Sequence, residues 1–129
     1  MWIFFKTGFV SVVKVQAGKV ASGQAMAPRD YYLDEVMVRS RSPQHLISFG
    51  CKAERIITTP HADYGYRVIM DRVEFIEHML EHMRAIEYGN FKGAISAAGQ
   101  ASTAFLCALN DVWSVMFHFQ INDKKGGKQ

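Results

Sequence analysis

The amino-acid sequence predicts an α+β fold, with an antiparallel sheet of about five strands and helices packed on one face. Short β-branched or alternating segments dominate the chain before residue 71. After that residue, apolar side chains recur at three- and four-residue steps, which is typical of amphipathic helices. The turn Pro60-His61-Ala62-Asp63 joins two of the predicted strands. These features favour a sheet built from hairpins and covered by helices that follow it in the chain.

The first hairpin is predicted at the start of the chain, where Trp2-Ile3-Phe4-Phe5 and the segment 9–15 flank the turn Lys6-Thr7-Gly8. Both strands are apolar at nearly every position, which predicts cover on both faces or an interface on one of them. The segment 16–30 is rich in alanine and glycine and has no clear period. We expect it to form a long mobile loop, with disorder favoured over a functional role.

The region 36–86 has the β-α-β-β-α order of a ferredoxin-like element, preceded by the N-terminal hairpin. Its first strand is predicted over 36–41. A short helix over 43–49 should follow, capped by Ser42 and ended by Gly50 in a left-handed conformation. The segments 55–59 and 64–70 are predicted as the second hairpin.

A helix is predicted from Arg72, because Asp71 and Glu74 have the spacing of a capping box. Its apolar residues share one side and are expected to pack on the sheet. They are Val73, Ile76, Met79, Leu80, Met83 and Ile86. The charged residues and histidines are expected to face water. They are Glu74, Glu77, His78, Glu81 and His82.

After a break at Gly89, Asn90 is expected to cap a helix that Gly99-Gln100 bends or divides. The last helix carries an apolar stripe of Phe105, Leu109, Val112, Trp113, Met116 and Phe119. We therefore predict a single domain over 1–121 and a disordered polar tail over 122–129.

Composition limits the classes of function. The chain has 129 residues and a formal charge of +3, so it permits nucleic acid or an acidic protein as a partner without a strongly basic footprint. Cys51 and Cys107 are far apart and are interpreted as free thiols in a reducing compartment. Lys6 and Lys14 interrupt the apolar start, and no apolar run reaches the roughly 18 residues of a spanning helix. We predict a cytoplasmic protein without membrane contact.

The motif His78-Met79-Leu80-Glu81-His82 matches the H-x-x-E-H pattern of inverted zinc peptidases. Catalysis would need a third protein ligand and an open coordination position, and no downstream helix with a paired acid follows. An exposed polar helix face is the preferred interpretation. Whether His78 and His82 bind a metal is left open, and no metal or cofactor is predicted.

Two groups of residues are candidate binding sites. His61, Asp63, Tyr64, Tyr66 and Arg67 would suit acid–base chemistry or a phosphate, although turn formation and packing explain them more simply. Arg39, Arg41 and Arg67 would line one sheet face if Val36 and Val38 point to the core. With aromatic residues between them, they would form a platform for single-stranded RNA, and protection of the sheet edge is the simpler interpretation.

A distinctive set of segments is formed by Met1-Trp2-Ile3-Phe4, the stretch 8–13, Asp63-Tyr64-Gly65-Tyr66-Arg67, Tyr88-Gly89-Asn90-Phe91-Lys92 and Val112-Trp113-Ser114-Val115-Met116. In combination they resemble a family of small uncharacterised bacterial and phage proteins. The resemblance covers most of the chain except 16–30 and the tail. It implies an intracellular single domain and an accessory or host-interaction role, for example inhibition of a host defence complex. It carries over no catalytic residue.

The leading functional hypothesis is a small non-enzymatic binding module that acts through protein–protein contact. The chain has many large aromatic side chains for one small sheet, so a homodimer is the simplest partner hypothesis. The first alternative is a protein that binds RNA or a nucleotide with its basic sheet face. The second is a small enzyme centred on His61 and Asp63.

Overall fold

The computed structural model describes residues 1–15 and 34–126, and it divides into two compact units, with the division after Glu87. The predicted loop over 16–30 lies outside the described residues. The division falls inside the single domain that the sequence predicts over 1–121.

The first unit is built on a five-stranded sheet in the order β1-β2-β3-β5-β4, in which every neighbouring pair is antiparallel. The strands are β1 (Trp2–Phe5), β2 (Gly8–Lys14), β3 (Glu35–Ser40), β4 (Ile57–Thr58) and β5 (Tyr66–Asp71). The predicted α+β class and the antiparallel sheet are confirmed.

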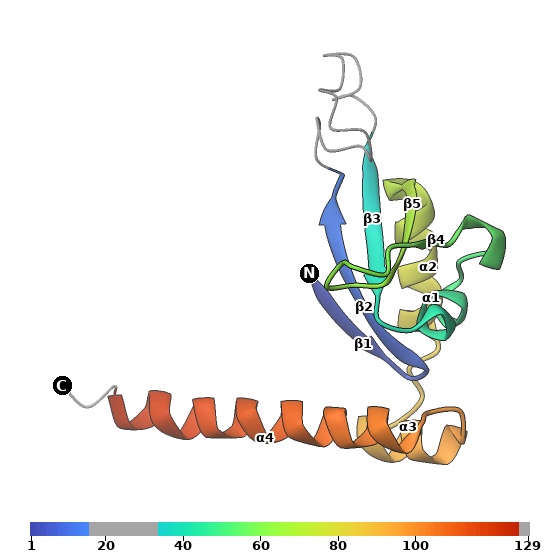
Figure 1. The fold of residues 1–129 in the computed structure, drawn as a ribbon. Coiled ribbons are helices and arrows are strands. Elements are labelled where there is room, and N and C mark those ends of the chain that lie inside the picture. The colour runs from blue at the N-terminus through green and yellow to red at the C-terminus, as the bar shows by residue number, and fades with distance from the viewer. Residues whose placement is uncertain (16–33, 127–129) are drawn as a thin grey trace. The chain divides into compact units, whose positions relative to one another are not determined.

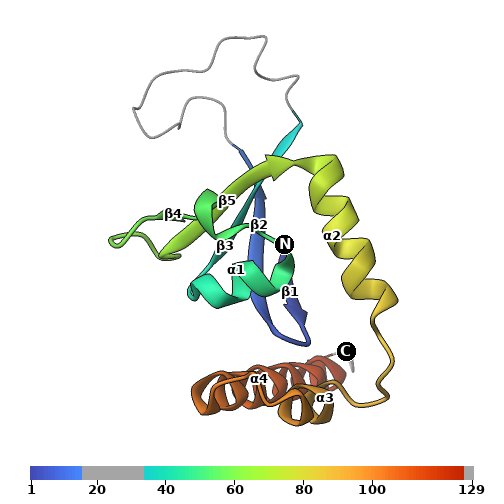
Figure 2. The same ribbon diagram turned by 90° about the vertical axis from the view of Figure 1, so that its right-hand side faces the viewer.

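Two helices, α1 (Pro43–Phe49) and α2 (Arg72–Arg84), lie on the same side of this sheet (Figures 1 and 2). Strand alternation explains why: Val36 and Val38 of β3 point to the helices, whereas Met37 and Arg39 point away. The buried core between the layers consists of Phe5, Val10, Val12, Val36, Val38, Leu46, Phe49, Cys51, Val68, Met70 and Phe75. The opposite face of the sheet carries none of the helices described in this unit.

The strand predicted over 55–59 is shorter in the structure. Arg55 ends the 3-10 helix η2 (Ala53–Arg55) instead, and only Ile57 and Thr58 form β4. The guanidinium of Arg55 donates to the carboxylate of Glu74 and to the carbonyl of Ile69. These contacts hold the segment in a turn before it reaches the sheet, which local propensity did not indicate.

The helix starts are correct, but two predicted caps are not formed. Neither Ser42 nor Asp71 accepts a side-chain hydrogen bond from the helix that follows it. The backbone nitrogen of Arg72 donates to the carbonyl of Asp34 at 2.7 Å, and Glu74 is engaged with Arg55. Tertiary partners therefore replace the capping box at the start of α2.

The second unit contains α3 (Phe91–Ala98) and α4 (Thr103–Gly126). The side chain of Asn90 accepts a hydrogen bond from the nitrogen of Gly93, as predicted, and Gly99 ends α3 at φ 66°. Ile95 and Leu109 are the buried residues of these helices. Because α4 continues to Gly126, residues 122–126 of the predicted polar tail are helical, and 127–129 lie outside the described residues. Polar composition alone did not indicate that the helix continues.

Gly50 makes the turn that ends α1. Its φ is 126°, a value that side chains disfavour, and its nitrogen donates to the carbonyls of Leu46 and Ile47. A methyl group at Gly50 would lie 2.3 Å from Nδ1 of His78. The close approach of α1 and α2 therefore depends on this glycine.

We expect Gly50→Ala to lower the free energy of unfolding by about 2–3 kcal/mol, since it combines backbone strain with a steric clash. The midpoint of urea unfolding measures this change. Gly65→Ala is the matched control, because a methyl group there meets no atom within 4 Å. Equal midpoints for the two variants would contradict the role assigned to Gly50.

Candidate binding surfaces

Five of the seven predicted site residues lie together at one end of the sheet. Arg39 of β3 and Arg67 of β5 are directly opposite in the strand register, on the face that points away from the core. Arg41 follows β3, and its guanidinium lies 3.2 Å from the carboxylate of Asp63. The ring of Tyr64 lies against the guanidiniums of Arg39 and Arg41. Alternation along β3 and β5 places Arg39 and Arg67 on this face, as expected from the sequence.

The ring of Tyr64 is the centre of this group. The guanidinium of Arg39 lies 4.6 Å from the ring centroid, and that of Arg41 lies 4.4 Å from it. Tyr64 is only 5% exposed, so the two cations cover an aromatic ring that is otherwise buried. Contacts of this kind hold guanidinium groups in fixed orientations.

Hydrogen bonds also fix the guanidinium groups of Arg39 and Arg67. Arg39 donates to Oγ of Ser11 at 2.9 Å, and Arg67 donates to Oγ1 of Thr59 and to the carbonyl of Tyr64. The Nε atom of Arg39 is buried and has no hydrogen-bond partner in the described part of the chain. The group contains three guanidiniums and the single carboxylate of Asp63, so its local charge is positive.

The other two predicted site residues do not join the group. Tyr66 pairs with Ser40 and packs against the core, on the opposite face of the sheet from Arg67. His61 is exposed in the turn, and it makes none of the contacts that connect the arginines, Tyr64 and Asp63. The carboxylate of Asp63 pairs with Arg41 instead.

An aromatic cluster lies beside the arginines on the same face of the sheet. The ring centroids of Trp2 and Phe9 are 6.2 Å apart, and those of Phe4 and Phe9 are 4.5 Å apart. Trp2 is 72% exposed. The sequence predicts either cover on both faces of this hairpin or an interface on one of them. Only the register of β1, β2 and β3 shows that the rings lie on the same face as Arg39.

The prediction for the sides of α2 is wrong for both histidines and for most of the apolar residues, while Glu77 and Glu81 are exposed as predicted. His78 and His82 turn towards the core, whereas Val73, Ile76 and Met83 are exposed. The ring of His82 stacks on Phe49 with a centroid distance of 5.3 Å. The apolar residues of α2 extend over a wider arc than the sheet can cover, and the aromatic side of that arc packs against Phe49. Met79 packs against the core as predicted.

The environment of the two histidines does not resemble a metal site. Nε2 of His82 donates to the carbonyl of Phe49 at 3.0 Å, since a carbonyl oxygen only accepts. Nε2 of His78 is buried and lies 3.7 Å from the carboxylate of Glu74, which is an ion-pair distance but too long for a hydrogen bond. Among residues 1–15 and 34–126, no group of three or more histidines, cysteines and acids is arranged to hold a metal ion.

We expect His82→Ala to destabilise the protein by about 2 kcal/mol, because it removes a packed ring and a hydrogen bond. Glu81→Ala, at the exposed neighbouring position, should change stability by less than about 0.5 kcal/mol. Urea unfolding of both variants measures the difference. In calorimetry, titration with zinc should release no more heat from the wild type than from His82→Ala. A larger heat from the wild type would indicate that the histidines bind the metal.

Two ionisable groups near the start of α2 are shifted. The hydrogen bond from Arg55 holds the pKa of Glu74 below its usual value. Burial raises the pKa of the Cys51 thiol to about 11. The other cysteine, Cys107, is exposed on α4. Both thiols are free, as the sequence predicts.

A carboxyl group whose pKa is lower in the folded protein than in the unfolded chain stabilises the fold at any pH above its unfolded pKa. This contribution is lost as the pH falls through the lower pKa of the folded state. We therefore expect wild-type stability to fall as the pH drops below about 4.3, the ordinary value for glutamate. Glu74→Gln should make the total loss of stability over this pH range smaller by up to about 1 kcal/mol, a modest amount because the pair is partly exposed. Unfolding midpoints across this pH range test it, with Glu77→Gln as the control that should keep the wild-type slope.

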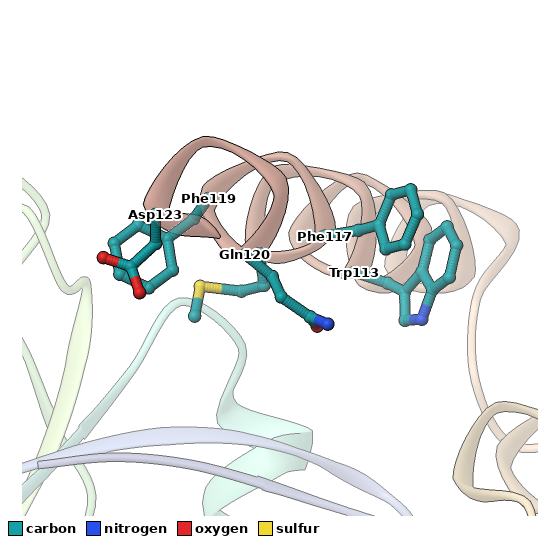
Figure 3. A pocket seen from close by; sticks show the side chains of 6 residues that line it. Trp113, Phe117, Phe119, Gln120 and Asp123 are labelled. Carbon is teal, nitrogen blue, oxygen red and sulfur yellow. The ribbon is translucent and has the colours of Figure 1, made fainter. Parts of the chain in front are cut away.

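A second apolar surface lies on α4. Trp113 and Phe117 stack with a centroid distance of 5.3 Å and an interplanar angle of 5°. With four further side chains of the same helix they line an open hollow of about 410 Å³ (Figure 3). The other lining residues are Met116, Phe119, Gln120 and Asp123.

Among the described helices, none combines the length and the apolar character needed to cross a membrane.

Comparison with known proteins gives no relative: no family model, curated protein or solved structure matches the chain. The family resemblance that the sequence suggests therefore stays a prediction.

Proposed function

We propose that the protein is a non-enzymatic binding module that acts through protein contact, and that it pairs with a second copy of itself through α4. One observation carries this proposal. Six large apolar side chains of α4 are 42% to 67% exposed, and they are Val112, Trp113, Val115, Met116, Phe117 and Phe119. Exposed apolar surface of this extent on a folded helix is typical of an interaction site.

The first part of the apolar stripe has a partner within its own unit. Leu109 is 6% exposed and Ile95 of α3 is fully buried. Lys92 of α3 also contacts α4, with its ammonium 4.6 Å from the ring centroid of Trp113. Beyond this point the stripe continues along Met116 and Phe119 without a covering helix in the described second unit. A second copy would extend the packing that α3 begins.

The chemistry of the stripe suits pairing with an identical surface. Residues 112–122 contain no aspartate, glutamate, lysine or arginine, so two copies bring no like charges together. In a two-fold pair each copy presents the same patch, and an uncharged apolar patch is complementary to itself. The six side chains expose roughly 500 Å² per copy, if an aromatic side chain has about 200 Å². The pair would bury about 1,000 Å², which is the lower end for specific interfaces and corresponds to a weak dimer.

We also propose that the segment from β3 to α2 is a ferredoxin-like element. Its support is the chain order β3, α1, β4, β5, α2 together with the position of β5 between β3 and β4. Since β5 is antiparallel to both, β3 and β4 are parallel, as in a split β-α-β unit. In this proposal β2 of the N-terminal hairpin pairs with β3 at the position of the fourth strand.

A small enzyme centred on His61 and Asp63 has less support, because the carboxylate of Asp63 pairs with Arg41. A host defence complex as the target, and a cytoplasmic location, stay predictions from the sequence. The dimer proposal is independent of both.

We expect the wild type to show a mass that rises from monomer to dimer with concentration in sedimentation or light scattering. Met116→Glu places a charge in the stripe and should weaken the dimer at least tenfold, or by about 1.4 kcal/mol. His118→Glu is the matched control, because the same charge two residues further along points to the opposite side of the helix.

Circular dichroism checks that both variants keep their helices. A wild type that stays monomeric at every concentration would contradict the proposal. So would equal weakening by Met116→Glu and His118→Glu, since the position of the charge on α4 would then not matter.

A further inference from the structure

The face of the sheet that points away from α1 and α2 has an ordered arrangement of side chains. The register aligns Trp2 of β1, Ser11 of β2, Arg39 of β3 and Arg67 of β5 in one row across four strands. Phe4 and Phe9 form the next row on the same face. We call the surface formed by Trp2, Phe4, Phe9, Arg39 and Arg67 the aromatic–arginine face.

We propose that the aromatic–arginine face binds single-stranded nucleic acid, with bases stacked on the rings and phosphates held by the arginines. Proteins that bind single strands combine these two features, because every base has a flat face and every nucleotide has a charge. An open sheet face with exposed rings is one of the known ways to display bases.

The arginines are oriented before any ligand arrives. Ser11 and the ring of Tyr64 hold the guanidinium of Arg39, while Thr59 and the carbonyl of Tyr64 hold that of Arg67. These partners are neutral, so they leave the positive charge uncompensated. A planar guanidinium presents paired donors that match two phosphate oxygens, and a fixed orientation lowers the entropy that binding costs.

The charge distribution favours an anionic ligand at this end of the sheet. Arg41 adds a third guanidinium, and Asp63 is the carboxylate that contacts it. Glu35 and Asp71 are on the same face but lie two rows away, beyond the row of Met37 and Ile69. The acids therefore limit the ligand to the end of the face that carries the arginines.

The spacing suits a chain that crosses the strands. Trp2 and Arg39 are two strands apart, which corresponds to about 10 Å, and Arg67 is one strand further. The rings and the guanidiniums thus occupy separate positions along one row. A ligand of a few nucleotides can stack on Trp2 and Phe9 while its phosphates reach Arg39 and Arg67, and this site size is at the low end for small single-strand binding domains.

The test is fluorescence anisotropy with a labelled oligouridine of about 12 nucleotides at several salt concentrations. The logarithm of the affinity should fall linearly with the logarithm of the salt concentration, with a slope of about −1.4 if two phosphates are bound. Labelled oligothymidine should bind similarly, because base stacking and phosphate contacts do not require a 2′-hydroxyl. A duplex of the same length should bind more weakly, since its bases are already stacked.

Two substitutions separate the two parts of the site. Trp2→Ala should weaken binding roughly tenfold without changing the salt slope, since it removes stacking but no charge. Arg39→Ala should weaken binding and reduce the magnitude of the slope by about 0.7. Arg84→Ala removes the same charge from the exposed end of α2, and it should change neither quantity measurably. Trp2 is largely exposed, so its loss does not threaten the fold.

An independent signal comes from Trp2 itself. Trp2 and Trp113 are the only tryptophans of the chain, so in the Trp113→Phe protein the fluorescence reports Trp2 alone. Stacking of a base should quench the fluorescence of Trp2 as the oligonucleotide is added.

The proposal is wrong if the wild type does not bind the oligonucleotide at low salt. It is also wrong if Arg84→Ala weakens binding as much as Arg39→Ala while Trp2→Ala has no effect. Met116→Glu should bind normally, which separates this site from the proposed dimer.

Discussion

The packing of Phe49 connects the sheet, α1 and α2. Phe49 is 1% exposed. Its ring centroid lies 5.7 Å from that of Phe5 in β1 and 5.9 Å from that of Phe75 in α2. Its carbonyl accepts a hydrogen bond from His82, and Gly50 then turns the chain. Because aromatic side chains surround this one ring, α2 must present its aromatic side to the core. The rotation of α2 about its own axis follows from that requirement.

The rotation of α2 determines which of its side chains are exposed on the first unit. With Phe75 and His82 inward, the aliphatic residues Val73 and Leu80 of α2 are exposed. The sheet adds the aromatic–arginine face on its other side. In the described residues, both groups of side chains lie on open surfaces of the first unit. The second unit also exposes apolar side chains, along α4.

Much of the fold was predictable, because local signals mark many of its elements. Asn90, Gly99 and Pro43 mark helix ends, and alternation in β3 places Arg39 opposite the core. The inward side of α2 was not predictable, because histidine packs on an aromatic ring as well as it faces water. The arginines of the candidate site follow from alternation, whereas their position beside Trp2 depends on strand pairing between distant segments. Periodicity contains no information about that pairing.

The contrast between the two cysteines has a practical consequence for chemical labelling. The thiolate is the form that reacts with maleimides and spin labels. Cys51 is buried and its raised pKa keeps it protonated near neutral pH, whereas Cys107 is exposed on α4. A thiol-directed dye or nitroxide will therefore attach to α4 in the natural sequence, without removal of Cys51. The protein carries its own single attachment point for spectroscopy of its last helix.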